Sequence, residues 1–144
     1  MSRIRGRDTN PEMQIRKGLH ACGFRYRLHA KDLPGQPDMV LPKFRTAIFI
    51  HGCFWHGHDC ELFKLPVTRR QFWETKIRSN RDRDLASISK LLAMGWRVAT
   101  IWECSLRGRG KLGSAEVVRQ CRQFLRASDT HRIDIRGTDL AYGE

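Results

Sequence analysis

The sequence lacks the features that would mark a membrane, secreted or multidomain protein. None of its apolar runs approaches the roughly 20 residues that a membrane-spanning helix needs, and its first five residues, MSRIR, do not begin a signal peptide. It contains no internal repeat, low-complexity tract or domain linker. With 144 residues, the chain is therefore expected to form one domain with a hydrophobic core of its own.

Acidic residues are scarce relative to basic ones. Asp and Glu total 15 against 27 Lys and Arg, which gives a formal net charge of +12, and 20 of the basic residues are arginine. The planar guanidinium group of arginine is well suited to phosphate. The excess indicates a polyanionic partner, and the lack of a basic amphipathic helix favours nucleic acid over a membrane. The alternative is a basic protein whose charge serves solubility alone.

The five cysteines are an odd number and follow no signal peptide, which indicates a reducing compartment. Cys22 and Cys121 fall on the apolar faces of expected helices, and we expect both to be core thiols. The remaining three lie close to histidines or follow an apolar strand. They are therefore candidates for metal binding rather than for disulfides.

Residues 48–60, IFIHGCFWHGHDC, begin as a buried strand and then combine cysteine, histidine and large aromatic residues. Cys53, one of His56 or His58, and Cys60 could supply three ligands to Zn²⁺, which favours thiolate and imidazole. Cys104, just past a later apolar strand, could supply the fourth. The alternative is that these are ordinary core or half-buried residues.

Apolar periodicity, capping residues and glycine positions predict a three-layer α/β domain with a mixed central β-sheet flanked by helices. A capping box at residues 68–71 starts the long helix, and Ser114 caps the last one. The expected buried stripe of the long helix is Phe72, Ile77, Leu85, Ile88, Leu91 and Leu92. We expect a basic arm at 1–9, a single domain at 10–126 and a tail at 127–144 to which no element is assigned. The expected elements are a helix from Asn10 to Gly23, strands at 24–28, 38–41 and 46–50, a helix at 68–95, a strand at 96–102 and a helix from residue 114.

Asp38 follows Pro37 at the start of a strand, and a hairpin would bring it beside Ile50 and His51. A carboxylate there suits Mg²⁺, and Glu12 on the first helix could hold a metal-bound water. The order of elements resembles the core of the PD-(D/E)XK nucleases. Asp38 could instead be an ordinary turn residue.

That nuclease pattern places a second acid and a lysine on the next strand, but residues 49–51 are Phe, Ile and His. His56 is the best candidate for a general base, and Asp84 or Asp82 could orient it. The alternatives are that His56 binds zinc and that Asp84 is a solvated helix charge. Phe54 and Trp55, joined by Trp73, could stack on bases or wedge between them, although core packing is the commoner fate of such residues.

Three segments, residues 33–38 (LPGQPD), 49–60 (FIHGCFWHGHDC) and 102–108 (WECSLRG), resemble the very-short-patch repair DNA mismatch endonucleases. The resemblance implies an enzyme that nicks the strand 5′ to the thymine of a T:G mismatch, left by deamination of 5-methylcytosine, by Mg²⁺-assisted hydrolysis. It implies double-stranded DNA as substrate, a repair polymerase and a mismatch-repair ATPase as partners, and a monomer acting on the nucleoid in the bacterial cytoplasm.

The resemblance also implies a role for each matching residue. Catalytic Mg²⁺ would bind Asp38 and the backbone carbonyl of Ile50, where the best-known family member has threonine. Glu12 and His51 would hold metal-bound waters, and Asp84 would orient His56 as the base. The implied zinc ligands are Cys53, His58, Cys60 and Cys104. The implied DNA-binding residues are Phe54, Trp55, Trp73, Lys76, Asn80 and Arg107.

Two other functions fit the same residues. One is a nicking nuclease of the PD-(D/E)XK type with another target. The other is a zinc-stabilised DNA-binding module without catalytic activity.

Overall fold

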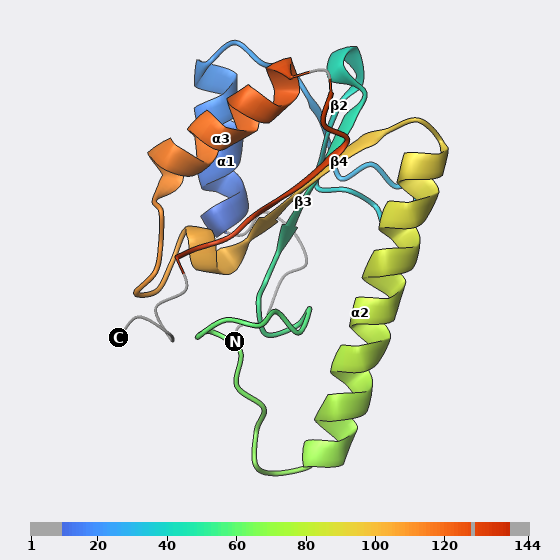
Figure 1. The fold of residues 1–144 in the computed structure, drawn as a ribbon, viewed down its shortest axis with the longest axis vertical. Coiled ribbons are helices and arrows are strands. Elements are labelled where there is room, and N and C mark those ends of the chain that lie inside the picture. The colour runs from blue at the N-terminus through green and yellow to red at the C-terminus, as the bar shows by residue number, and fades with distance from the viewer. Residues whose placement is uncertain (1–9, 128, 139–144) are drawn as a thin grey trace.

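A mixed β-sheet separates two layers of helices (Figure 1). The computed structural model describes residues 10–127 and 129–138, so the basic arm expected at 1–9 lies outside the described residues. Within them the sheet has five strands, in the order β1-β2-β3-β4-β5. The strands are β1 (Arg27–Leu28), β2 (Met39–Leu41), β3 (Thr46–His51), β4 (Arg97–Trp102) and β5 (Arg132–Ile135). The helices are α1 (Asn10–Ala21), α2 (Arg70–Ala93) and α3 (Ser114–Arg126).

Strand pairing changes from antiparallel to parallel at the central strand, β3. β1 and β2, and β2 and β3, pair antiparallel, whereas β3 with β4 and β4 with β5 pair parallel. A parallel pair needs a long crossover, and α2 and α3 supply the two that are required. Met39 lies opposite Ile48, and His51 lies opposite Trp102. The expected hairpin and the expected mixed sheet are therefore confirmed.

Each face of the sheet has its own core. Ile15 and Leu19 of α1 pack with Val117 and Phe124 of α3 against one face. Ile88 and Leu91 of α2 pack with Val40, Phe49 and Val98 against the other. Because side chains alternate between the faces of a strand, neighbours such as Ile48 and Phe49 enter different cores. The central strands are buried on both sides, as the continuous apolar run of β3 predicts.

Helix α2 extends well beyond the sheet, and the loop after β3 lies beside its first half (Figure 1). Phe72 and Leu85, which we expected on its buried stripe, are 44% and 55% exposed. That expectation was wrong because the sheet is too short to cover so long a helix. The expected capping box is also absent: Arg69 precedes the helix with a left-handed backbone (φ 57°) and no side-chain cap.

Three further expectations need correction. Cys22 is exposed, because α1 ends at Ala21 and the helical face does not continue to it. The strand expected at 24–28 is reduced to Arg27–Leu28. Gly113 (φ 91°), rather than Ser114, occupies the cap position of α3. Cys121 is buried as expected, and β5 occupies part of the stretch to which the sequence assigned no element. No helix among the described residues has the length and apolarity needed to cross a membrane.

Arg97, at the start of β4, joins the sheet to the end of α3. Its guanidinium group donates to the carbonyls of Phe124 (2.5 Å), Ala127 (2.8 Å) and Thr130 (3.0 Å) and lies over the Phe124 ring. The last carbonyls of a helix have no hydrogen-bond donor within the helix. Arg97 supplies a donor to carbonyls at the end of α3. Burial lowers the pKa of Arg97, which is the cost of this placement.

We therefore expect Arg97→Met to lower the free energy of unfolding by about 2–4 kcal/mol, because several carbonyls, two of them in part-buried contacts, lose a charged donor at once. Arg45 is a matched control: it donates to the carbonyls of Met94 and Gly95 at the end of α2, but from an exposed position. Arg45→Met should cost about 1 kcal/mol. Urea denaturation of both variants gives the comparison, and equal losses would contradict the role assigned to Arg97.

Candidate active site and metal centre

Parallel pairing of β3 with β4 brings two cysteines together. Cys53 follows the end of β3, and Cys104 lies in the short 3₁₀ turn Glu103–Ser105 that follows β4. The backbone N–H of Cys104 donates to Cys53 Sγ at 3.3 Å. The loop after Cys53 folds back, with the N–H of His58 donating to the Cys53 carbonyl at 2.9 Å. This turn places His58 and then Cys60 next to Cys53 and Cys104.

The ligand atoms of Cys53, His58, Cys60 and Cys104 all lie within 4.8 Å of one another. His58 Nδ1 is 3.5 Å from Cys53 Sγ and 3.6 Å from Cys104 Sγ. Tetrahedral zinc with ordinary bond lengths would separate sulfur from nitrogen by about 3.5 Å. The cluster therefore fits a zinc ion, and it includes His58 rather than His56.

The electrostatics of the cluster favour a bound cation. The hydrogen bond between the two thiol groups lowers the pKa of Cys104 to about 4 and raises that of Cys53. One of these sulfurs therefore favours the thiolate form and the other the thiol form. Burial raises the pKa of Cys60. A metal ion would replace the thiol protons and stabilise all the thiolates together.

A second group of side chains lines a cleft of about 570 Å³ between α2 and the ends of β2 and β3. Asp38 lies at its floor, where the backbone N–H of Ile50 donates to Asp38 Oδ2 at 2.7 Å. Burial raises the pKa of Asp38 from 3.8 to about 6, although this hydrogen bond lowers it in part. One carboxylate oxygen is thus held by the backbone, and the other remains to bind a cation. The cleft also contains His51, His56, Asn80 and Asp84.

His56 contacts two different partners in this cleft. Its Nδ1 lies 2.5 Å from Asp84 Oδ2, and its ring stacks on His51 with centroids 3.8 Å apart and planes 4° apart. Burial, and then the neighbouring His56, lower the pKa of His51 to about 3, so its imidazole is neutral. With Nδ1 directed at the carboxylate, His56 has Nε2 left to exchange a proton. Of the two aspartates considered from sequence, the structure brings Asp84 to His56, whereas Asp82 is exposed.

Glu12 is only 2% exposed and forms the far side of the Asp38 region. Its Oε2 lies 3.1 Å from the Arg16 guanidinium and 3.3 Å from His29 Nε2. The ligand atoms of Glu12, His29 and Asp38 lie within 4.8 Å of one another, so this group could also hold a cation. Sequence reasoning missed Arg16 and His29. The spacing of four residues between Glu12 and Arg16 was an available signal, whereas His29 gave none.

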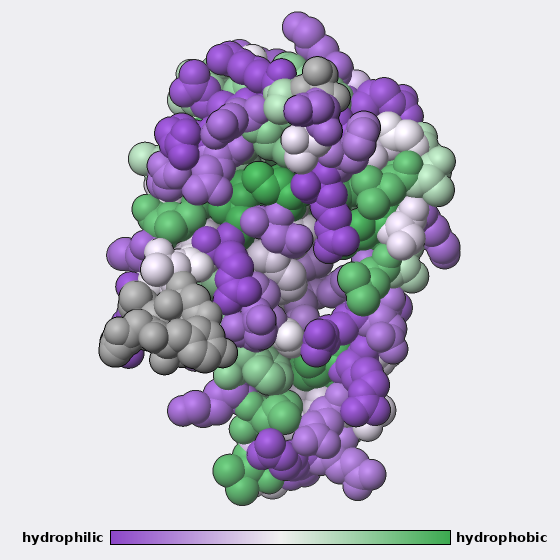
Figure 2. Space-filling view, viewed as in Figure 1, coloured by the Kyte–Doolittle hydropathy of each residue, from purple (hydrophilic) through white to green (hydrophobic). Residues whose placement is uncertain are grey.

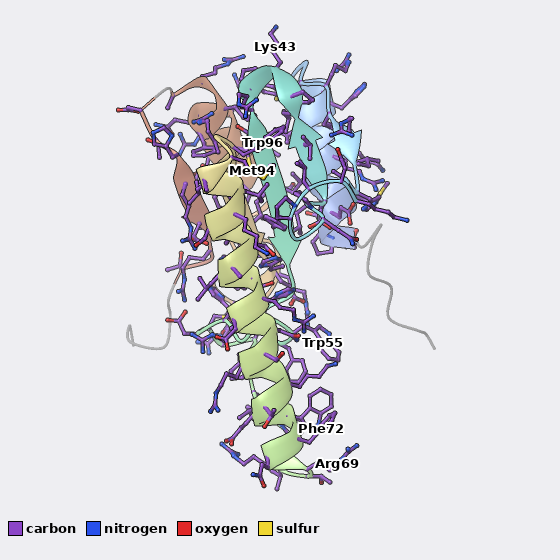
Figure 3. All side chains as sticks on the ribbon, turned by 90° about the vertical axis from the view of Figure 1, so that its right-hand side faces the viewer. Lys43, Trp55, Arg69, Phe72, Met94 and Trp96 are labelled. Atoms are coloured by element: carbon purple, nitrogen blue, oxygen red, sulfur yellow. The ribbon has the colours of Figure 1, made fainter. Side chains whose placement is uncertain are left out.

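An aromatic cluster of Phe54, Trp55 and Trp73 lies beside the cleft. The ring centroids of Phe54 and Trp55 are 5.4 and 5.7 Å from that of Trp73. The Asn80 amide donates to the Trp55 carbonyl at 2.8 Å and so connects this cluster to α2. Figure 3 shows Trp55 and Phe72 beside the half of α2 that extends beyond the sheet. Apolar residues also interrupt the largely hydrophilic surface at this end of the molecule (Figure 2). Val67, three residues before α2, is 89% exposed.

The two remaining candidate DNA contacts lie at the surface. Lys76 is exposed on α2. Arg107 is also exposed and forms an ion pair with Glu103, whose other oxygen accepts the Cys53 N–H at 3.0 Å. Glu103, which sequence reasoning did not single out, thus connects a surface arginine to the loop after β3 that carries Cys53, His58 and Cys60.

Comparison with known proteins gives the family. The family model described as DNA mismatch endonuclease Vsr matches residues 1–62. The DNA mismatch endonuclease Vsr of Escherichia coli K12 is 42% identical over 141 residues, which cover 97% of this chain and 90% of that protein. This chain belongs to the Vsr family. The type II nicking enzyme V.XorIIP of Xanthomonas oryzae is 49% identical over 112 residues, or 78% of this chain and 82% of the relative.

A third relative, the type II nicking enzyme V.NmeAIP of Neisseria meningitidis, is 42% identical over 109 residues, which cover 76% of this chain and 78% of that enzyme. Membership of the Vsr family makes this protein a DNA endonuclease that hydrolyses phosphodiester bonds. The acid, the histidine pair and the basic composition described above are consistent with that chemistry.

The raised pKa of Asp38 predicts a pH-dependent stability. The folded chain holds the Asp38 proton more tightly than the unfolded chain, so stability is lost as pH rises from about 4 to about 6. In magnesium-free buffer at pH 8, Asp38→Asn should therefore be more stable than the wild type, by about 1–3 kcal/mol. The gain should vanish at pH 4.

Urea denaturation of the zinc-loaded proteins at both pH values measures this effect. Asp32→Asn serves as the control, because Asp32 is exposed and only loosely paired with Arg27. An Asp38→Asn variant that is less stable than the wild type at pH 8 would show that ionised Asp38 is not destabilising.

Proposed function

We propose that the protein nicks the DNA strand 5′ to the thymine of a T:G mismatch, left by deamination of 5-methylcytosine, and so starts very short patch repair. The observation that carries this proposal is the placement of Asp38 and the His56–Asp84 pair in one cleft. An aromatic cluster lies beside that cleft, and the relative from Escherichia coli is named a DNA mismatch endonuclease.

The proposal includes two metal sites. Zn²⁺ would bind Cys53, His58, Cys60 and Cys104, where four protein ligands leave no open position for chemistry. Mg²⁺ would bind the free oxygen of Asp38 and the Ile50 carbonyl, in a PD-(D/E)XK-like core. When bound, Mg²⁺ supplies charge stabilisation to the phosphate that is being cleaved.

The side chains around Asp38 would perform the proton transfer. His56 accepts a proton from the attacking water at Nε2, while Asp84 fixes the ring and stabilises its charged form. Neutral His51, stacked on His56, and buried Glu12 hold waters at the metal position. His51 lines the cleft at the end of β3, and Glu12 approaches Asp38 from α1, so both are held by elements of the core.

The aromatic cluster would supply selectivity. Insertion of Phe54, Trp55 and Trp73 beside a base step costs a few kcal/mol of stacking, and a mismatched step costs less to open. Lys76 and Asn80 would contact the mismatched bases, and Arg107 would contact DNA nearby. The preference for T:G would then begin as a difference in deformability between DNA sequences.

We further propose that one endonuclease domain acts as a monomer in the bacterial cytoplasm. Because β5 pairs with β4, we include β5 in that domain with residues 10–126. The nicked strand would pass to a repair polymerase, with a mismatch-repair ATPase as a further partner. A nicking enzyme with another DNA target is the second candidate, since relatives such as V.XorIIP are named type II nicking enzymes.

A nicking assay on paired duplexes tests the proposal. With Mg²⁺, the duplex that contains T:G should be cut 5′ to the thymine, and the same duplex with C:G should not be cut. His56→Ala should lower kcat by about 10²–10⁴-fold, because a positioned general base typically contributes that much. Asp84→Asn should lower kcat by about 10²-fold or more, because it removes the charge that holds the His56 tautomer.

Asp82→Asn is the matched control for Asp84, since Asp82 lies two residues away on α2 and is exposed. It should change kcat by less than about twofold, in line with the small effects of surface substitutions. Equal cleavage of T:G and C:G duplexes would favour the second candidate function. Full activity in His56→Ala would remove His56 from the mechanism.

The aromatic cluster predicts a separate effect on binding. Trp55→Ala should weaken binding to a T:G duplex by about 10- to 100-fold, because stacking on one base is worth roughly 1–3 kcal/mol. It should also reduce the preference for T:G over C:G. Met94→Ala is the control, since Met94 is an exposed apolar residue at the opposite end of α2 (Figure 3). Fluorescence anisotropy without Mg²⁺ measures both, and an unchanged preference in Trp55→Ala would exclude the wedge.

A further inference from the structure

The chain after β5 lies directly against the Cys53–His58–Cys60–Cys104 cluster. β5 runs parallel to β4 (Figure 1), so it ends beside the turn that carries Cys104. Three consecutive residues, Arg136, Gly137 and Thr138, then contact three different segments around the metal ligands. None of the three belongs to the ligand set, and the sequence pattern gave them no role.

Arg136 holds the backbone between two ligands. Its guanidinium group donates to Asp59 Oδ1 at 2.7 Å and to the Asp59 carbonyl at 3.1 Å. Asp59 lies between His58 and Cys60, so this double contact fixes the turn that presents both. An exposed ion pair contributes little to overall stability, and Asp59 is highly exposed. The contact therefore matters for the local geometry of the loop more than for folding.

Gly137 contacts the ligand on the other side of the cluster. Its backbone N–H donates to Cys104 Sγ at 3.3 Å. A Cβ at this position would lie 2.3 Å from the Cys104 carbonyl oxygen and 2.8 Å from the Gly110 carbonyl oxygen. Such close approach of three backbone segments is open only to glycine. The next N–H, of Thr138, donates to Gly110 at 2.7 Å and fixes the strand end in place.

The charges of this segment suit a thiolate-rich site. Zn²⁺ with three thiolates and a neutral imidazole carries a net negative charge. Burial lowers the pKa of Arg136, but its hydrogen bond to Asp59 and the charge of Asp59 raise it overall, with smaller raising contributions from Cys104 and Cys60. The N–H of Gly137 adds a hydrogen bond to a sulfur that would carry negative charge. Contacts of this kind around a metal ligand typically change metal affinity by about 10- to 100-fold.

We propose that Arg136 and Gly137 are positioning residues that complete the zinc centre from the segment after β5. The inference rests on the proposed zinc site and adds a function for residues beyond its four ligands. Arg136 orients the turn between His58 and Cys60, and Gly137 orients and hydrogen-bonds Cys104. The segment after β5 thereby sets how tightly the loop that carries His56 and Trp55 is held.

Chelator competition with zinc-loaded protein tests this proposal. Arg136→Gln should weaken zinc binding by about 10-fold or more, measured as transfer of zinc to a coloured chelator. Arg119→Gln is the matched control, because Arg119 also forms an exposed ion pair with a carboxylate, that of Glu116, within α3. It should retain wild-type affinity. In excess zinc, the thermal midpoints of the two variants should be similar, which separates metal affinity from general destabilisation.

A double-mutant cycle with Asp59→Asn gives a second readout. If Arg136 acts through Asp59, the loss of affinity in the double variant should be smaller than the product of the two single losses. Gly137→Ala should also weaken zinc binding, because the added Cβ would displace the backbone around Cys104. If Gly137→Ala does not fold, the result for Arg136→Gln still decides the test. Wild-type zinc affinity in Arg136→Gln would overturn this inference alone. Absence of bound zinc in the purified wild type would overturn the proposed zinc site, and this inference with it.

Discussion

The parallel pairing of β3 with β4 is the constraint on which the site depends. It aligns His51 with Trp102, so the chain leaves both strands at the same edge of the sheet and brings Cys53 beside Cys104. The antiparallel pairing of β2 with β3 adds Asp38 at that edge, hydrogen-bonded to the backbone of Ile50. Acid, histidines and thiols that are far apart in sequence thus meet because backbone hydrogen bonds fix the register of three neighbouring strands.

The parts of this arrangement that depend on short stretches of chain could be predicted from sequence. The hairpin that places Asp38 beside Ile50 follows from turn residues and an apolar strand, and the cysteine and histidine spacing indicates a metal cluster. Features that depend on packing could not be predicted. The exposure of Phe72 follows from how far α2 extends beyond the sheet, and β5 is a short strand with little apolar pattern. The contacts of Arg97 and Arg136 join segments that only the folded chain brings together.

Burial gives the cleft its electrostatic character. It holds a carboxyl group with a raised pKa beside a neutral His51, within a chain of net charge +12. Basic residues at the surface attract a polyanion, whereas the floor of the cleft favours a cation or a proton. The metal-free site is therefore less stable than its bound form. Such a site is stabilised when a cation and a phosphate bind together. The cation offsets the negative charge of the carboxylate and the phosphate, and the phosphate offsets the positive charge of the cation and the basic surface.

Helix α2 carries Trp73 near its start and Asp84 eleven residues later, which corresponds to about 16 Å along the helix axis. In the proposed function, Trp73 lies where the duplex is distorted, and Asp84 orients the general base His56 at the bond that is cleaved. A continuous helix bends little over three turns. In that proposed function, α2 would fix the distance between the mismatched pair and the cleaved bond, independent of the sequence of the DNA.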